Sequence, residues 1–269
     1  VIPSGQIGLS APNEDADYLR ALSIFRNSSI VQYYLFFTSP QLGVDRGRIT
    51  LGAFEQLPVP LFSDDQISQL SQLHKNFSER EHDVLLNNED VQEELDDMVE
   101  KILNIPKNVG ILAKDFMSVR LSLNEGKSHG IAVDLPSLET LFDYGSTLRD
   151  ELDMFTGGNG LRHEIVLSRS KELVICSVEF IQSDDPIDVS IEEAQTESSA
   201  LFAYIREKIK QRFSQWVYVQ RSLRIFEDSR VYICKPPRLI DWTRTQALND
   251  SDDIISEILS AQRRLNTVV

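Results

Sequence analysis

The chain has 269 residues, of which 41% are hydrophobic and 26% are charged, with 27 Lys and Arg against 42 Asp and Glu. The hydrophobic share is enough for a folded core and excludes a mainly disordered chain. No apolar stretch approaches the roughly 20 residues that cross a bilayer, so we expect a cytoplasmic protein without membrane contact. Cys176 and Cys234 are too few for a disulfide framework or a zinc cage, and they suit a reducing compartment.

Charge is unevenly distributed along the chain. The net charge is −15, yet residues 201–269 carry 12 basic and 8 acidic side chains, and residues 206–244 carry 10 basic against 4 acidic. An acidic protein repels nucleic acid at long range, whereas a local basic strip can still bind phosphates. An alternative stays open, in which these basic side chains pair with acidic regions of the same chain.

The first 62 residues predict a helix followed by extended chain. Asp15 or Asp17 is a candidate N-cap for a helix whose apolar side chains recur near every 3.6 residues. The run 30–37 is too apolar to be exposed and continues either as a strand or as a second helix. Glycines and prolines between 43 and 62 favour short extended pieces over helix.

Two long helices are predicted next. Ser63 and Gln66 match a capping box, in which side chains satisfy the free amides of a first helical turn. A narrow apolar stripe follows, and a second helix is expected at about 89–103, before Pro106. Long antiparallel helices of this kind usually serve as spacers or partner surfaces.

Beyond residue 108 the apolar period changes from helical to alternating. The predicted elements are helices over 109–155, strands at 164–167, 173–180 and 187–189, a helix at 192–213, a hairpin of 216–226 with 230–235, and a last helix at 250–265. The chain is therefore predicted to be α+β, with a helix-rich N-terminal half containing spacer-like helices and a smaller, antiparallel-sheet α+β C-terminal half. We expect segments 1–62, 63–108 and 109–269, the last containing a basic hairpin at 216–235, with the change between halves near 105–135.

The sequence offers no self-sufficient active site. Gly157-Gly158-Asn159-Gly160 follows a helix and precedes a strand, which is the reverse of a dinucleotide fingerprint, so it indicates a turn. The four histidines lack the spacing of metal ligands. Glu125-Gly126-Lys127 resembles a nuclease triplet, but it lies in a predicted loop with no metal-binding acid on a preceding strand. We expect no catalytic or metal-binding residue in this chain.

Aromatic and basic residues interleave between residues 204 and 244. With a period of two, Tyr218, Gln220, Ser222 and Arg224 share one strand face. A polar face bearing Arg and Tyr can meet phosphates or base edges. The alternative is a hairpin whose aromatic side chains fill a small core while its charges are merely solvated.

Three stretches carry a family resemblance. The first is 22–30 with 33–36, the second runs from Gly43-Val44-Asp45-Arg46 to Leu57-Pro58-Val59-Pro60 and Ser63, and the third combines 232–236 with 242–250. They resemble, in turn, a helix after a catalytic domain, the passage from a target-recognition module into spacer helices, and a C-terminal tail. The family is the adenine-N6 DNA methyltransferases of restriction-modification systems, of type I modification-subunit-like or fused type II form.

The family's catalytic motifs are missing from this sequence. Neither an Asp/Asn-Pro-Pro-Tyr/Phe motif nor a Gly-rich S-adenosylmethionine loop occurs, and Pro236-Pro237 has no aromatic neighbour. The resemblance therefore implies that S-adenosylmethionine and base flipping belong to a catalytic domain outside this chain, which itself needs no cofactor. The opening Val1-Ile2-Pro3, without an initiator Met, is expected of a piece of a longer polypeptide.

The leading hypothesis is a non-catalytic C-terminal region of such a methyltransferase, contributing DNA contact and subunit assembly in restriction-modification or related phage defence. Segment 1–62 would then be a target-recognition-like remnant and 63–108 the spacer. The partners implied are double-stranded DNA, the catalytic domain of the same polypeptide, and specificity or restriction subunits. The residues expected to contact the DNA backbone are Arg221, Arg224, Arg230, Lys235, Arg238 and Arg244, with Arg46 and Arg48 as a second, weaker patch.

Two rival hypotheses remain. In the first, the chain is a protein-interaction module that docks a helicase, nuclease or specificity subunit and does not touch DNA, which the acidic residues 1–200 favour. In the second, the chain is an independent hydrolase or nuclease, which requires metal-dependent activity of the isolated chain.

Overall fold

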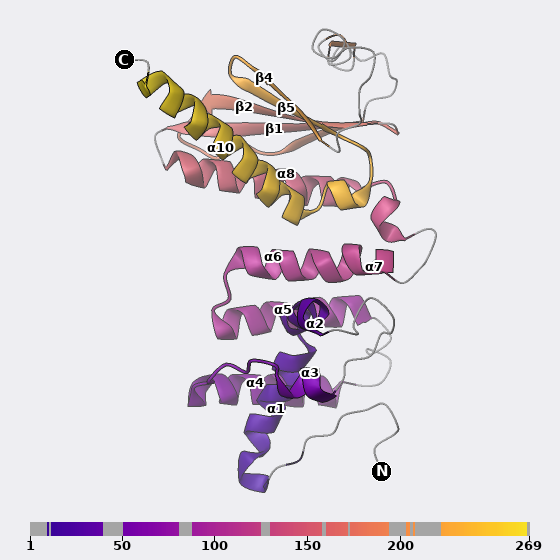
Figure 1. Ribbon diagram of the computed structural model, residues 1–269. Helices are drawn as coiled ribbons and strands as arrows, with labels where there is room; N and C mark the ends of the chain where they lie inside the picture. The colour runs from indigo at the N-terminus through magenta and orange to yellow at the C-terminus, as the bar shows by residue number, and fades with distance from the viewer. Residues whose placement is uncertain are drawn as a thin grey trace. The chain divides into compact units, whose positions relative to one another are not determined.

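The computed structural model describes residues 10, 12–39, 51–80, 88–124, 130–157, 160–171, 173–193, 203, 204, 207 and 222–267. The fold is α+β, as predicted, with helices alone in the described N-terminal half and a five-stranded sheet in the C-terminal half. The chain divides into two compact units, Val1–Lys127 and Ser128–Val269. Figure 1 gives the elements of both, and each unit is described by itself.

The first unit is a helical assembly. Its described elements are a short 3-10 helix (Asn13–Asp15), α1 (Ala16–Asn27), α2 (Ser29–Thr38), α3 (Leu51–Glu55), α4 (Asp64–Glu79), α5 (Asn88–Leu103), α6 (Lys107–Asp115), a π-helical turn (Phe116–Arg120) and α7 (Leu121–Asn124). Apolar side chains of α1, α4 and α5 form its main core, which consists of Ala21, Ile24, Leu70, Leu73, Leu95, Val99 and Ile102. The long helices are therefore held together by α1 instead of standing free.

The capping box that opens α4 is confirmed. Ser63 Oγ accepts from the Gln66 amide at 3.3 Å, and Gln66 Oε1 accepts from the Ser63 amide at 3.0 Å. The Gln66 side-chain amide also donates to the Ile102 carbonyl at 3.1 Å. One short motif therefore both begins α4 and fixes that beginning against the end of α5.

Helix α2 begins at a carboxylate supplied by another helix. The amide and the hydroxyl of Ser29 donate to the two oxygens of Asp96 in α5, at 2.7 and 2.6 Å. Asp96 is only 4% exposed, so the charge lies in the interior and is compensated by these hydrogen bonds and by the positive end of the α2 dipole. Distant segments of the first unit are locked together at this point.

Of the two alternatives left open for the run 30–37, the second helix is confirmed. This helix, α2, buries Val31 and Leu35 four residues apart, on one face. Part of 43–62 is also helical, since α3 forms over Leu51–Glu55 and buries Phe54, whereas 57–62 is neither helix nor strand. Residues 43–50 lie outside the described residues. Residues 109–124, which the sequence analysis groups with the C-terminal domain, belong to the first unit.

The second unit packs two helices on a sheet. Its described elements are a 3-10 turn (Ile131–Val133), α8 (Leu138–Thr156), β1 (Leu161–Arg169), β2 (Val174–Gln182), β3 (Ser190–Glu193), β4 (Leu223–Glu227), β5 (Arg230–Lys235), a second 3-10 turn (Leu239–Asp241) and α10 (Arg244–Thr267). The strand order is β3-β1-β2-β5-β4. Because β3 runs parallel to β1, the sheet is mixed, which corrects the predicted antiparallel sheet.

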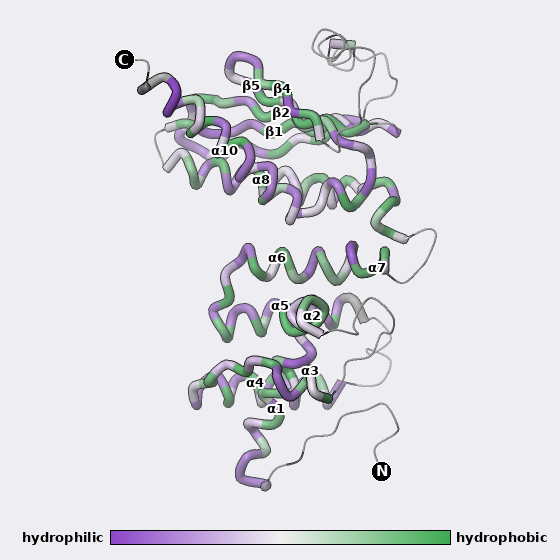
Figure 2. The backbone as a smooth tube through the Cα atoms, in the orientation of Figure 1, coloured by the Kyte–Doolittle hydropathy of each residue, from purple (hydrophilic) through white to green (hydrophobic). Residues whose placement is uncertain are grey.

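Helices α8 and α10 cover the same face of the sheet, as Figure 1 shows. The core between them contains Leu141, Leu148, Ile165, Leu167, Cys176, Ile233, Trp242 and Ile254, among others. A Cβ added at Gly145 of α8 would lie 2.7 Å from Val189 and 2.9 Å from Leu167, so glycine permits this close approach. Figure 2 shows the polar last turns of α10, in contrast to the apolar strand β2.

Several elements of the second unit begin or end at other residues than predicted. The hairpin is confirmed as β4 and β5, with Asp228 at φ 46° in its turn, whereas 216–221 lies outside the described residues. The third strand is Ser190–Glu193 instead of 187–189, so the predicted helix at 192–213 does not begin at 192. The last helix starts at Arg244, where Thr243 Oγ1 accepts from the Gln246 amide. Among the described residues, no helix is long and apolar enough to cross a membrane.

Candidate nucleic-acid interface

The basic residues predicted to contact DNA fall into two groups. Arg46, Arg48 and Arg221 lie outside the described residues. The other five lie in the second unit, on the β4–β5 hairpin or between it and the first turn of α10, and are Arg224, Arg230, Lys235, Arg238 and Arg244. Arg244 is half-buried in the first turn of α10. The described members of the predicted basic strip therefore lie in one unit but are spread along it, since Arg230 begins β5 and Lys235 ends it, and their side chains differ widely in exposure.

Arg224 forms an ion pair with the last helix. Its Nη2 lies 2.6 Å from Asp253 Oδ2 of α10, and its side chain is 24% exposed. The face that was predicted to present Arg224 to phosphates therefore directs this guanidinium to α10, so the charge is compensated within the unit.

Arg230 and Arg238 lie nearer the surface. Arg230 Nη2 is 2.5 Å from Glu179 Oε2, its register partner on β2, and the Arg230 side chain is 48% exposed. Hydrogen bonding to Glu179 raises the pKa of Arg230. Arg238 Nε is 2.7 Å from Asp241 Oδ2 and its side chain is 38% exposed. Surface pairs of this kind contribute at most about 1 kcal/mol, so their guanidinium groups can exchange a carboxylate for a phosphate.

Lys235 lies in the core, and the structure corrects its assignment as a surface DNA contact. Its ammonium pairs with Asp250 of α10, and the two side chains are 3% and 5% exposed. Tyr144 of α8 donates its hydroxyl to the same Asp250 oxygen at 2.7 Å, and Lys235 also donates to the Asp241 carbonyl at 3.3 Å. A phosphate cannot reach Lys235 unless a buried carboxylate loses its counter-ion.

Aromatic rings enclose this buried pair. The Lys235 ammonium lies 5.4 Å from the ring centroids of both Tyr144 and Trp242, whose rings meet edge to face at 4.9 Å. The indole N–H of Trp242 donates to the Pro236 carbonyl at 2.9 Å. Burial raises the pKa of the Tyr144 hydroxyl, so it remains a donor to Asp250. The cluster of Tyr144, Lys235, Trp242 and Asp250 is therefore a fully engaged structural site.

The alternative in which the basic side chains pair with acids of the same chain is confirmed for Arg224, Arg230, Lys235 and Arg238, although the sequence did not indicate which acids. Asp250 and Asp253 are three residues apart on α10 and so share a helix face, and Glu179 faces Arg230 across β2 and β5. The acids on the last helix were visible in the sequence, but only the packing of that helix against the sheet matched each acid to a base.

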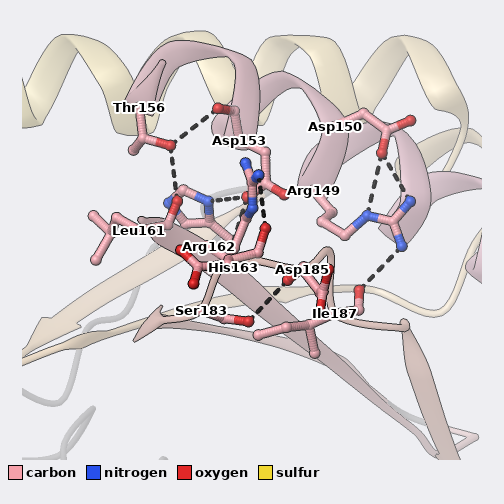
Figure 3. A network of polar contacts seen from close by, with 11 residues as sticks. Arg149, Asp150, Asp153, Thr156, Leu161, Arg162, His163, Ser183, Asp185 and Ile187 are labelled. Carbon is pink, nitrogen blue, oxygen red and sulfur yellow. Dashed lines mark hydrogen bonds and ion pairs between the residues drawn. The ribbon is translucent and has the colours of Figure 1, made fainter. Parts of the chain in front are cut away.

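A second polar network joins α8 to β1 and the loop after β2 (Figure 3). His163 Nδ1 lies 2.7 Å from Asp153 Oδ1, which also accepts from the His163 amide at 3.1 Å. The imidazole is 1% exposed and meets Phe180 edge to face at 4.8 Å. Burial lowers the pKa of His163 despite the carboxylate, so the ring is neutral near pH 7. Arg149, which lies on α8 with Asp153, donates to the Ile187 carbonyl at 3.1 Å.

In this network the Asp153 carboxylate orients the His163 ring, and neither cysteine of the chain is available as a nucleophile beside it. Both cysteines are buried, and burial raises the pKa of Cys234 to about 12 and that of Cys176 further, so both remain thiols. Among the described residues, no three His, Cys, Asp or Glu side chains converge to hold a metal ion. Comparison of the chain with models of protein families, with curated proteins and with solved structures finds no match.

Proposed function

We propose that this chain is the non-catalytic C-terminal region of an adenine-specific DNA methyltransferase of a restriction-modification or related phage-defence system. It contributes DNA contact and subunit assembly, while the methyl transfer and S-adenosylmethionine belong to the catalytic domain of the same polypeptide. The partners in this proposal are double-stranded DNA, that catalytic domain and specificity or restriction subunits.

The observation that supports this proposal most is the passage from non-helical chain into the spacer helix. Residues 57–62 are neither helix nor strand, Ser63 and Gln66 form the capping box, and α4 then packs on α1 and α5. The resemblance implied this order of elements at these residues. A helix pair anchored at its start in this way can hold recognition and assembly surfaces at a fixed separation.

Within the second unit the proposal assigns DNA contact to Arg230 and Arg238. They are the more exposed of the four ion-paired bases, whereas Lys235 is buried and Arg224 is held to Asp253 at 24% exposure. Each surface pair is weak enough for DNA to displace the carboxylate. Displacement of the carboxylate costs part of the binding energy, so Arg230 and Arg238 are suited to orienting DNA more than to holding it tightly.

The same ion pairs favour the protein-interaction module as a second candidate. Four predicted contacts with the DNA backbone are neutralised by acids of this chain. In this alternative the acidic chain docks another subunit and does not bind DNA. The two candidates differ in one measurable property, which is the affinity of the chain for duplex DNA at low salt.

Salt-dependent binding of labelled duplex DNA to the 269-residue chain tests the proposal. The Arg230→Ala/Arg238→Ala variant is expected to bind more weakly and to lower the slope of log K against log salt by about two. Arg169→Ala is the matched control, because Arg169 is also ion-paired, to Glu193, but lies outside the basic strip. No binding by the wild-type chain in low salt would overturn the DNA-contact role and leave the protein-interaction module.

The coding sequence upstream of Val1 tests the assignment to a methyltransferase independently of DNA affinity. The expected finding is a Gly-rich strand-loop and an Asp/Asn-Pro-Pro-Tyr/Phe motif. An upstream region that encodes neither would contradict the proposal whatever the DNA affinity of this chain.

A further inference from the structure

Arg26 differs from Arg20 and Arg80 of the first unit, which are ion-paired to Asp17 and Glu94. Its guanidinium carbon lies 3.2 Å from the centroid of the Phe54 ring, joining the last turn of α1 to α3. Its Nε is buried and has no hydrogen-bond partner, and Arg26 forms no ion pair with any residue that the structure describes. Burial lowers the pKa of Arg26, yet a guanidinium stays charged at neutral pH. A half-buried cation thus lacks an anion.

Arg80 is an arginine of the same unit whose contacts are all structural, and it serves as a comparison for Arg26. Its guanidinium also lies over a phenylalanine, 4.5 Å from the Phe77 centroid. Unlike Arg26, it donates from both terminal nitrogens to Glu94, at 2.6 and 2.5 Å. The two arginines share an aromatic support and differ in their counter-ion, so Arg80 is an internal reference for Arg26.

Stacking alone accounts for the position of Arg26 but not for its buried Nε, which has no hydrogen-bond partner. A guanidinium over an aromatic face gains cation–π energy and suits the negative C-terminal end of α1. The stack also holds the planar group in one orientation, which reduces the entropy lost when it binds a phosphate through two parallel hydrogen bonds. Such a pre-oriented guanidinium is a typical phosphate contact in nucleic-acid interfaces.

We infer that Arg26, stacked on Phe54, is a binding site for a backbone phosphate of duplex DNA in the first unit. The inference rests on the proposed DNA-contact function and adds a residue that the basic strip does not contain. In the sequence, Arg46 and Arg48 precede Phe54 by eight and six residues. The second, weaker patch predicted for DNA contact is therefore close to Phe54 along the chain.

The test measures binding of a fluorescein-labelled duplex to the full 269-residue chain by anisotropy, over a series of NaCl concentrations. Arg26→Gln is expected to lower the slope of log K against log salt by about one and to weaken binding by about eightfold near 0.1 M salt. Arg26→Lys keeps the charge and is expected to keep the wild-type slope while losing affinity. Arg80→Gln, the matched control, is expected to change neither quantity.

The outcomes separate this inference from the proposed function. If the wild-type chain binds DNA and Arg26→Gln binds with the same affinity and slope, the Arg26 site is wrong and the proposed function stands. If the wild-type chain does not bind DNA at low salt, both are overturned. Circular dichroism checks that Arg26→Gln folds. If it does not, the Nε–H NMR signal of Arg26 in the wild-type chain decides, because DNA must shift it and an unmoved signal refutes the site.

Discussion

At the scale of single residues, the second unit contains buried polar side chains whose hydrogen-bonding groups have partners inside the protein. His163 donates from its amide and from its ring Nδ1–H to Asp153, and Lys235 pairs with Asp250 where both side chains are buried. Buried polar groups cost free energy unless their partners are in place, so each of these residues depends on a neighbour from another element.

The burial of His163 predicts a pH dependence of stability. Its pKa is lowered from 6.5 in the folded state, so the unfolded chain binds the proton more readily. The free energy of unfolding should therefore be highest above pH 6.5 and fall as the pH decreases below it, by at most about 1.4 kcal/mol per pH unit for this group. Urea denaturation of wild type and His163→Gln between pH 7.5 and 5.5 measures the difference.

A shallower pH dependence in His163→Gln is the expected result. His74 serves as a comparison, because burial also lowers its pKa but it lies half-exposed on α4. Equal pH dependence in wild type and His163→Gln would contradict the argument from burial.

At the scale of elements, α10 is bound to the sheet by charges as well as by apolar packing. Asp250 forms an ion pair with Lys235 of β5, and Asp253 forms one with Arg224 of β4. Ile254 of the same helix lies in the hydrophobic core. Tyr144 of α8 donates to Asp250, so both covering helices converge on one carboxylate. The position of α10 thus depends on residues from three other elements.

Removing one partner of the buried pair should cost far more than removing both. Lys235→Met leaves the Asp250 carboxylate buried without a cation, and we expect a loss of about 3–5 kcal/mol of unfolding free energy. Lys235→Met/Asp250→Leu leaves no buried charge, so its loss should be smaller. Urea denaturation of the three proteins measures both values. Arg230→Met is the control, since its exposed pair with Glu179 should contribute at most about 1 kcal/mol. A double variant no more stable than Lys235→Met would contradict this account.

At the scale of the whole molecule, excess negative charge is the dominant electrostatic feature. The chain carries 42 acidic and 27 basic residues, and many of the described bases are already paired with an acid. Unpaired carboxylates then repel one another in the folded chain and repel DNA at long range. Any DNA contact must therefore come from a few local cations, which agrees with the small number of arginines assigned to it above.

This excess predicts that salt stabilises the fold. Raising NaCl from 20 to 500 mM shortens the Debye length from about 20 Å to about 4 Å and screens the repulsion between carboxylates. The midpoint of thermal unfolding should rise, because at net charge −15 the screened repulsions outnumber the weak surface pairs that salt also screens. Thermal unfolding followed by circular dichroism measures the midpoint, and a midpoint that falls with salt would show that ion pairs dominate.

The sequence by itself determined the local elements whose signals lie close together along the chain. The capping box at Ser63 and Gln66, the helix ending near Pro106 and the β4–β5 hairpin are examples. A cap or a turn is decided by residues within about four positions of one another, so its pattern can be read without knowing the fold. The α+β class follows from the change of apolar period between the two halves.

Only the tertiary structure decided which strand lies beside which and which base meets which acid. The parallel pairing of β3 with β1, the helical state of the apolar run in α2 and the burial of Lys235 all depend on contacts between distant residues. Arg26 is the clearest case, because its partner Phe54 is 28 residues away and its lack of a counter-ion among the described residues is a property of packing. Charge and burial are set by neighbours in space, and the sequence gives no distance between them.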